Sequence, residues 1–286
     1  MGLPDALARA TGVTDALRLD APAKLNLSLR VVARRDDGYH ELESELVLLE
    51  LADRLLLLPG CSGLRVEGTD ADGLPIGDEN LAWRGLVAGL GGAPDLVCLT
   101  LDKRIQAAAG LGGGSSDAAA AWRLGRASRG LSDTASGEEL ATLAAIGADV
   151  PFFAAATPAA RVTGIGERVE PSAVASRHVV LVHPPVGLST ADVFAELRTD
   201  EWGRRPNDLL APALRLRPEI GDVMDRVRAA GGEARMSGSG PTIFSLTDDP
   251  DRAGALAASL RDEGLRVTVT RTRDAAARIE RISEEE

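Results

Sequence analysis

A glycine-rich segment, QAAAGLGGGSSDAAAA at residues 106–121, most constrains how this chain can fold. Four of the five residues from Gly110 to Gly114 are glycine, and an alanine-rich helical pattern follows at once. Glycines let backbone N–H groups turn inward without interference from a Cβ atom. A helix that begins directly behind them adds aligned N–H donors and the positive end of its dipole. The segment therefore predicts a phosphate-binding loop between a strand at 96–101 and a helix at 117–124.

The loop does not match the three commonest phosphate-binding signatures. No lysine follows the glycines, as a Walker A loop requires, and Ser115 stands where dinucleotide-binding and protein-kinase loops have their third glycine. A flexible linker is the plain alternative. Structured patterns frame the segment on both sides, however, and Ser115 or Ser116 is suited to cap the helix. A nucleotide phosphate remains the favoured ligand.

Composition bounds the class of protein. The chain has 286 residues, 44% of them hydrophobic, and a net charge of −11, which argues against a nucleic-acid or anionic-membrane surface. Cys61 and Cys98 show no metal-binding spacing, so two reduced cysteines are expected, with neither a metal site nor a disulfide. No basic and apolar leader and no membrane-length apolar run is present in the sequence. We expect a cytoplasmic protein, either a monomer or a weak homodimer.

Hydrophobic patterns divide the chain into two halves. Residues 24–31 alternate between polar and apolar, which predicts a strand with Lys24, Asn26 and Ser28 on one face. Beyond residue 176 the patterns follow the order β-α-β-β-α-β of a ferredoxin-like unit. The stretch 171–176 is the best boundary, so we expect domains at 1–170 and 171–286, with a frayed acidic tail at 283–286.

Two further features suggest chemistry. Lys24 and Lys103 are the only lysines among 32 basic residues, which hints that each is present for its compact ammonium group. A second glycine cluster, MSGSGPTIF at 236–244, joins two predicted strands. A hairpin turn explains it, but it has more glycines than a turn needs, and close approach to a ligand competes as an explanation.

Three segments together resemble a known family. PAKLNLSLRV at 22–31, GLGGGSSDAAAA at 110–121 and MSGSGPTIF at 236–244 match, in order and spacing, the three motifs of the GHMP small-molecule kinases. The segment DDGYHEL at 36–42 is similar to the members that phosphorylate a cytidine diphosphate-linked methylerythritol. The resemblance implies an α/β (α+β) two-domain fold with its active site between the halves. The N-terminal half would resemble domain 2 of ribosomal protein S5, and the C-terminal half would be ferredoxin-like.

The resemblance also implies a catalytic pair, Lys24 and Asp149. Asp149 would take the proton of the attacking hydroxyl, and Lys24 would keep Asp149 ionised. From the residues alone, Asp149 could equally be a loop carboxylate and Lys24 an exposed strand lysine. ATP is implied as cosubstrate, together with Mg²⁺, for which no ligand is assigned. The residues implied for ATP are Gln106, Ala107, Ala108, Ala109, Gly110, Leu111, Gly112, Gly113, Gly114, Ser115 and Ser116, with Asn80 and Lys103 on the adenine side.

The acceptor site is implied at the cytidine end of the cleft. Tyr39 and His40 would stack on and hydrogen-bond the base, and Phe194 would close the sandwich, although Phe194 also suits the core face of a helix. The remaining implied contacts are Asn26, Thr190, Ser237 and Gly238. Gln106 departs from the family, which usually has proline there, without removing a phosphate donor. Two alternatives stay open: a GHMP kinase of the homoserine or mevalonate type, and a nucleotide-binding module without catalysis.

Overall fold

The first half of the chain is built on a long antiparallel hairpin, β1 (Ala16–Arg34) and β2 (His40–Pro59). The computed structural model describes residues 16–94 and 96–282, so the expectations for the tail at 283–286 and for a leader within residues 1–15 lie outside the described residues. The strand predicted at 24–31 is confirmed as part of β1. Register shifts in the β1–β2 pairing, one of them between Asn26 and Ser28, interrupt its strict alternation.

The hairpin is the centre of a seven-stranded sheet. β2 also pairs with β4 (Val97–Lys103) and β5 (Ala159–Gly164), each antiparallel. β3 (Gly63–Gly68) runs parallel to β4, and β6 (Arg168–Ser172) pairs with β5. The order along the main path is β11-β1-β2-β4-β3, where β11 is the short strand Glu280–Ile282.

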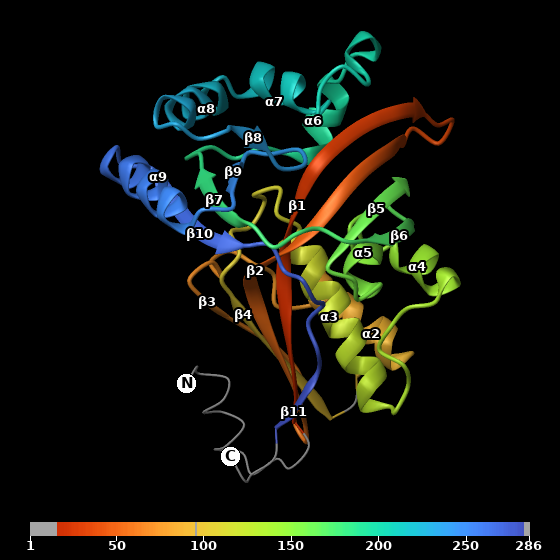
Figure 1. The fold of residues 1–286 in the computed structure, drawn as a ribbon. Helices are drawn as coiled ribbons and strands as arrows, with labels where there is room; N and C mark the ends of the chain where they lie inside the picture. The colour runs from red at the N-terminus through yellow and green to blue at the C-terminus, as the bar shows by residue number, and fades with distance from the viewer. Residues whose placement is uncertain (1–15, 95, 283–286) are drawn as a thin grey trace.

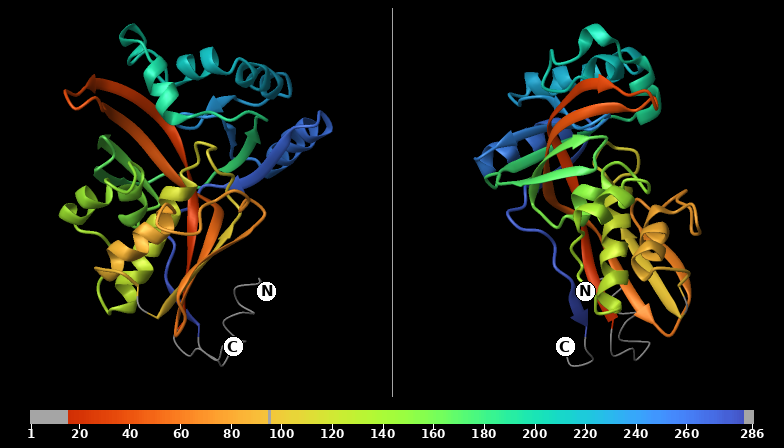
Figure 2. Two further views of the ribbon diagram at one scale, coloured as in Figure 1. Left: turned by 180° about the vertical axis from the view of Figure 1, so that it is seen from behind. Right: turned by 90° about the vertical axis from the view of Figure 1, so that its right-hand side faces the viewer.

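Helices α2 (Leu81–Leu90) and α3 (Gly113–Ser128) pack on each other, and α3 also packs against β1 and β2 (Figure 2). Two glycines of α2 permit this close approach. A Cβ atom on Gly85 would lie 2.0 Å from the Ala118 carbonyl oxygen, and one on Gly89 would lie 2.3 Å from that of Trp122. The short helices α4 (Gly137–Leu143) and α5 (Val150–Ala154) complete this half. None of the helices in the described part of the chain is long and apolar enough to cross a membrane.

The second half confirms the predicted ferredoxin-like order. Its four-stranded sheet has the antiparallel order β10-β7-β9-β8, and helices α6, α7 and α8 lie over one end of it (Figure 1). Helix α9 packs on β7, β9 and β10. The elements are β7 (His178–His183), α6 (Thr190–Glu196), η1 (Thr199–Glu201), α7 (Leu210–Leu216), α8 (Glu219–Ala229), β8 (Arg235–Met236), β9 (Ile243–Thr247), α9 (Pro250–Asp262) and β10 (Arg266–Arg271).

The two halves exchange short segments. After β10 the chain returns to the first sheet, where β11 (Glu280–Ile282) pairs with β1. In the other direction, Leu29 and Val31 near the end of β1 are buried in the core of the second half. The Leu29 N–H donates to the Pro206 carbonyl at 2.8 Å. The division at residues 170/171 stays a prediction, and these crossings hold the halves together around the cleft.

The predicted cap of the helix behind the glycine loop was wrong. We expected Ser115 or Ser116 to cap a helix over 117–124, but α3 begins at Gly113 behind Gly112, whose φ is +70°. No side chain caps this end. The left-handed turn at Gly112 starts the helix earlier than a serine cap would, so both serines lie within α3.

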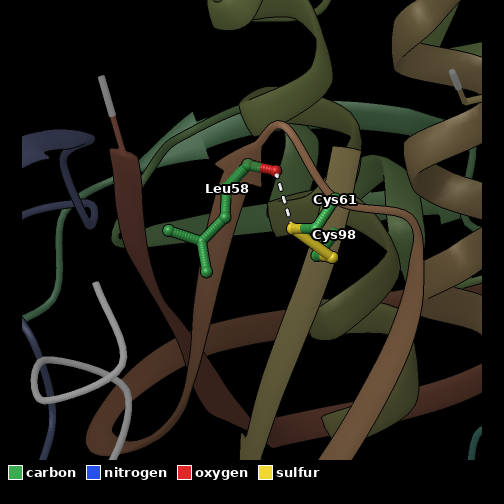
Figure 3. Close-up of a disulfide and its surroundings, with 3 residues drawn as sticks. All are labelled: Leu58, Cys61 and Cys98. Atoms are coloured by element: carbon green, nitrogen blue, oxygen red, sulfur yellow. Dashed lines mark hydrogen bonds between the residues drawn. A yellow bond between two sulfur atoms is a disulfide. The ribbon is translucent and has the colours of Figure 1, made fainter. Parts of the chain in front are cut away.

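The expectation of two reduced cysteines was also wrong. Cys61 and Cys98 form a disulfide with their Cα atoms 5.3 Å apart, and the Leu58 carbonyl oxygen lies 3.7 Å from the Cys61 Sγ (Figure 3). The parallel pairing of β3 with β4 sets Gly63 opposite Cys98, which brings Cys61 alongside. A separation of 37 residues in the sequence gives no indication of this pairing.

Candidate active site

A cleft of about 560 Å³ is lined by residues of the β1–β2 hairpin, of the loop before α3 and of helix α6. Most of the predicted site residues line it: Lys24, Asn26, Asn80, Lys103, Gln106, Ala107, Ala108, Ala109, Gly110, Gly112, Gly113, Gly114, Ser115, Asp149, Thr190, Phe194 and Gly238. Residues from both halves of the chain therefore line one cavity, which is where the resemblance to the GHMP kinases implies the active site.

The glycine loop forms one wall of the cleft and directs the start of α3 into it. Gly110 and Gly112 have φ values of +73° and +70°, which L residues with a side chain rarely adopt. A Cβ on Gly110 would lie 2.5 Å from the Ser237 carbonyl oxygen, so the loop touches the second glycine cluster directly. The Ser237 hydroxyl donates to the Gly110 carbonyl at 2.9 Å. The second cluster is thus a close-packed support for the loop.

Lys24 and Asp149 are brought together beside this loop. The Lys24 Nζ lies 3.3 Å from an Asp149 carboxylate oxygen, with the lysine side chain 5% and the aspartate side chain 36% exposed. The Lys24 ammonium also donates to the Asn26 amide oxygen, and the backbone N–H of Lys24 donates to the Leu111 carbonyl at 2.9 Å. The lysine is thereby held on β1, and Asp149, just before α5, keeps access to the cleft.

Hydrogen bonds and close contacts around this pair join the three sequence motifs at 22–31, 110–121 and 236–244. The Asn26 amide nitrogen donates to the Ser44 hydroxyl at 2.8 Å, and the Asn26 backbone N–H donates to the Ser237 hydroxyl at 3.4 Å. A Cβ on Gly238 would lie 2.9 Å from the Asn26 amide oxygen and 3.2 Å from the Lys24 Nζ. The three motifs are therefore in mutual contact around the lysine.

One aromatic ring, that of Phe194 in α6, lines the cleft, and it stacks on a histidine outside the lining. The rings of His40 and Phe194 stack with centroids 5.3 Å apart and planes at 24°, and Trp202 meets the His40 ring edge-on at 6.0 Å. Burial first, and then the charge of Arg34, lowers the pKa of His40 below its usual value. The imidazole is therefore neutral at pH 7, so one ring nitrogen donates and the other accepts.

On the side predicted for adenine, two polar side chains are already engaged. Asn80 caps α2: its amide oxygen accepts from the Ala82 N–H at 2.9 Å, and its amide nitrogen donates to the Pro75 carbonyl at 2.7 Å. The Lys103 ammonium donates to Asp117 at 2.7 Å and also binds the carboxylate of Asp53.

Comparison with known proteins places the chain in a family. Residues 191–265 match the family model described as "GHMP kinases C terminal". A 4-diphosphocytidyl-2-C-methyl-D-erythritol kinase from Thermus thermophilus is 39% identical over 85% of this chain and 92% of that protein. The enzyme of the same name from Rhodopseudomonas palustris is 40% identical over 87% of this chain and 94% of that protein. The chain belongs to this kinase family.

Solved structures agree with this membership. A crystal structure of 4-(cytidine 5'-diphospho)-2C-methyl-D-erythritol kinase has a TM-score of 0.73, at 37% identity, over 89% of this chain and 98% of that one. A homoserine kinase from Cytophaga hutchinsonii covers 94% of this chain and 98% of its own, with a TM-score of 0.61. At 17% identity it shows the shared fold alone. Membership of the GHMP kinases implies ATP as the cosubstrate of this kinase.

Five predicted site residues do not line the cleft of this kinase: Tyr39, His40, Leu111, Ser116 and Ser237. Leu111 and Ser237 are buried supports of the loop, and His40 reaches the cleft through its stack on Phe194. Tyr39 is 61% exposed beside the hairpin turn. Ser116 is buried on the other side of α3, in a small cavity shared with Arg123. Ser28, expected on the face of Lys24, is also absent, and past the register shift Leu29 lines the cleft instead.

Sequence reasoning missed four polar or aromatic residues of this region: Ser44, Asp53, Asp117 and Trp202. Asp117 alone had an indication in the sequence, because a carboxylate directly before four alanines interrupts an otherwise apolar helix face. Asp53 and Ser44 sit in β2 without a pattern that marks them. Their roles come from strand pairing, which places Asp53 beside the start of the loop and Ser44 beside Asn26.

Proposed function

We propose that this kinase transfers the γ-phosphoryl group of ATP to the 2-hydroxyl of 4-diphosphocytidyl-2-C-methyl-D-erythritol, a step in the non-mevalonate route to isoprenoid precursors. The observation that supports it most strongly is the arrangement of one cleft. The Lys24–Asp149 pair lies beside a glycine loop, and Phe194, stacked on His40, lines the same cleft. The relatives of 39–40% identity carry this activity in their names.

Asp149 acts as the general base in this proposal. Its carboxylate, partly exposed to the cleft, accepts the proton of the 2-hydroxyl while that oxygen bonds to the γ-phosphorus. The bond from the γ-phosphorus to the bridging oxygen breaks, and ADP leaves. Lys24, 3.3 Å from Asp149, holds the carboxylate in place and offsets the charge that builds up near the acceptor.

The loop and α3 hold the triphosphate. Phosphoryl transfer requires positioning and charge stabilisation more than covalent chemistry from the protein. Backbone N–H groups of residues 106–115 and the N-terminus of the 16-residue α3 supply donors of fixed direction. Both serines lie within the helix, and of the two only Ser115 lines the cleft. Ser116 lines a small cavity on the other side of α3.

Mg²⁺ fits the donor set at this end of the cleft. The ion prefers oxygen ligands, keeps several waters and needs few protein carboxylates when phosphates are present. Ser115 and Asp149 would be its neighbours, since the Ser115 hydroxyl packs against Gly147 in the segment that leads to Asp149. Within the described residues no group of three or more His, Cys, Asp and Glu side chains could form a dedicated cage. The bound ion would neutralise charge on the phosphates.

In this proposal His40 and Phe194 bind the cytosine base of the substrate. A pyrimidine base stacks well on the Phe194 ring. With the His40 and Phe194 centroids only 5.3 Å apart, no third ring fits between them, so the base must stack on the free face of Phe194 or part the pair. Tyr39, exposed on the hairpin, would have to move inward to complete the sandwich.

A coupled assay of ADP release tests the proposal against the homoserine- or mevalonate-type alternative. We expect turnover with the cytidine substrate and none above background with homoserine or mevalonate, which have no base to stack. Turnover of homoserine or mevalonate alone would refute the assignment. A fold shared with those kinases at 12–17% identity does not bear on the substrate.

A further inference from the structure

A buried charge cluster underlies the ATP loop. It consists of Asp53 from β2, Lys103 at the end of β4 and Asp117 in α3, with 0%, 3% and 3% of their surfaces exposed. The Lys103 ammonium bridges the two carboxylates, at 2.7 Å from Asp117 and in direct contact with Asp53. Three charged groups without solvent are costly to bury unless they are well paired. Such a cluster next to a binding cleft calls for a role.

The cluster contacts both ends of the loop. At the entry, the Asp53 carboxylate accepts the backbone N–H groups of Arg104 and Ile105, the latter at 2.8 Å. At the exit, Asp117 belongs to the helix that the loop starts. A Cβ on Gly113, the first residue of α3, would lie 3.4 Å from the Lys103 Nζ. One ammonium therefore ties the start of the loop, the start of the helix and the sheet together.

The charges around Lys103 show that its ammonium is already paired within the protein. Burial by itself would lower the pKa of Lys103, but the two carboxylates outweigh it and raise that pKa, so the ammonium stays charged. Burial and then the Asp53 charge raise the pKa of Asp117 well above its usual range, against the opposing effect of Lys103. Two buried carboxylates already share this one cation, so an ATP phosphate would have to displace one of them to bind it.

We propose that Asp53, Lys103 and Asp117 are positioning residues that fix both ends of the phosphate loop, and that Lys103 is not itself a ligand of ATP. The inference rests on the proposed function only in taking ATP as the ligand of the loop. It replaces the expectation that Lys103 contacts adenine with a structural role in preorganising the loop amides.

Asp117→Leu tests whether Lys103 positions the loop or binds ATP directly, because it leaves a neutral Lys103–Asp53 pair in the interior. If the cluster positions the loop, the Kd for MgATP and the KM for ATP both rise about tenfold, since a loosened loop loses aligned donors. The KM for the cytidine substrate stays within about threefold, and hydrogen exchange of amides 104–117 accelerates. Asp117→Asn, which keeps an oxygen acceptor for Lys103, restores values near wild type. Asp117→Ser, too short to reach Lys103, gives the same comparison if the leucine variant does not fold.

Asp133→Leu is the control, because it removes another ion pair of α3, in which the buried Arg123 lies 2.7 Å from the partly exposed Asp133, outside the cleft. It should lower the Tm and leave the MgATP Kd unchanged. Unchanged MgATP binding by Asp117→Leu would overturn the proposal, because the cluster would then not position the loop. Tighter MgATP binding would also overturn it, because Lys103, with one carboxylate fewer, would then bind ATP directly. Loss of MgATP binding with metal-free ATP binding intact would also overturn it, by making Asp117 a metal ligand. Binding is measured by calorimetry without acceptor, so a wrong acceptor assignment cannot mimic either result.

Discussion

Gly110→Ala tests whether contact between the two glycine clusters sets the geometry of the phosphate loop. The new Cβ would lie 2.5 Å from the Ser237 carbonyl oxygen and 2.8 Å from that of Gly240. Ordinary contact begins near 3.4 Å, so the loop and the cluster must separate by about 0.9 Å. Both neighbours are backbone atoms, so no flexible side chain can relieve the overlap.

The expected loss follows from that displacement. A shift of about 1 Å in a positioned group costs on the order of 100-fold in rate, or about 2.7 kcal/mol of transition-state stabilisation. The φ of +73° adds about 1–2 kcal/mol of backbone strain against folding. We therefore expect kcat/KM for ATP, measured by ADP release at saturating acceptor, to fall about 100-fold, and the Tm to fall by a few degrees.

Gly130→Ala is the matched control for backbone strain. Gly130 has nearly the same φ, +70°, but no atom lies within 4 Å of its Cβ position, and it lies outside the cleft. This variant should lose stability alone, by about 1–2 kcal/mol in urea unfolding, and keep its activity. If Gly110→Ala retains kcat/KM within about threefold while its Tm falls like that of Gly130→Ala, the clusters do not fix the loop by contact.

Three further predictions follow from the geometry of the site and the core. Asp149→Asn should lower kcat by about 10²–10⁴-fold with the Kd for metal-free ATP unchanged, because it removes the base but no loop donor; near-normal turnover would exclude Asp149 as the base. Phe194→Ala should raise the KM for the cytidine substrate about 5- to 100-fold and that for ATP less than threefold, through lost stacking; equal effects would remove Phe194 from the base site. Burial, and then Arg266, lower the pKa of His183 to about 4, so between pH 6.5 and 4 the unfolded chain binds the proton that the folded one excludes. Urea unfolding should therefore show stability falling by roughly 3 kcal/mol as pH drops through that window, and His183→Gln should lose this dependence; an unchanged slope in the variant would assign it to other groups.

The sequence was sufficient for local features and for the order of the elements. Glycines at 110–114 before an alanine run predicted both the loop and the helix that follows it. The pattern of apolar residues predicted the ferredoxin-like half, whose strand order β10-β7-β9-β8 is as expected. These features depend on neighbouring residues, so a single sequence contains them.

Features that depend on pairing between distant segments could not be read in this way. Lys24 and Asp149 are 125 positions apart and were linked only through the resemblance to a family. Asp53 reaches the loop because β2 and β4 are neighbours, with Arg54 opposite Asp102. A register shift after Asn26 turned Ser28 away from the cleft, which strict alternation cannot foresee.

The scarcity of lysine was a useful indication whose meaning changed with the structure. Both lysines do sit at the cleft, but each is bound to protein carboxylates: Lys24 to Asp149, and Lys103 to Asp53 and Asp117. No arginine lines the cleft in the described part of the chain. The described residues that line the cleft therefore offer no uncompensated side-chain cation to the two phosphate-bearing substrates proposed for this acidic protein. The phosphates must be held by fixed backbone dipoles of the loop and α3, which are effective only when correctly aligned. This explains why so much of the molecule, from Ser237 to the buried charge cluster, is devoted to fixing the loop.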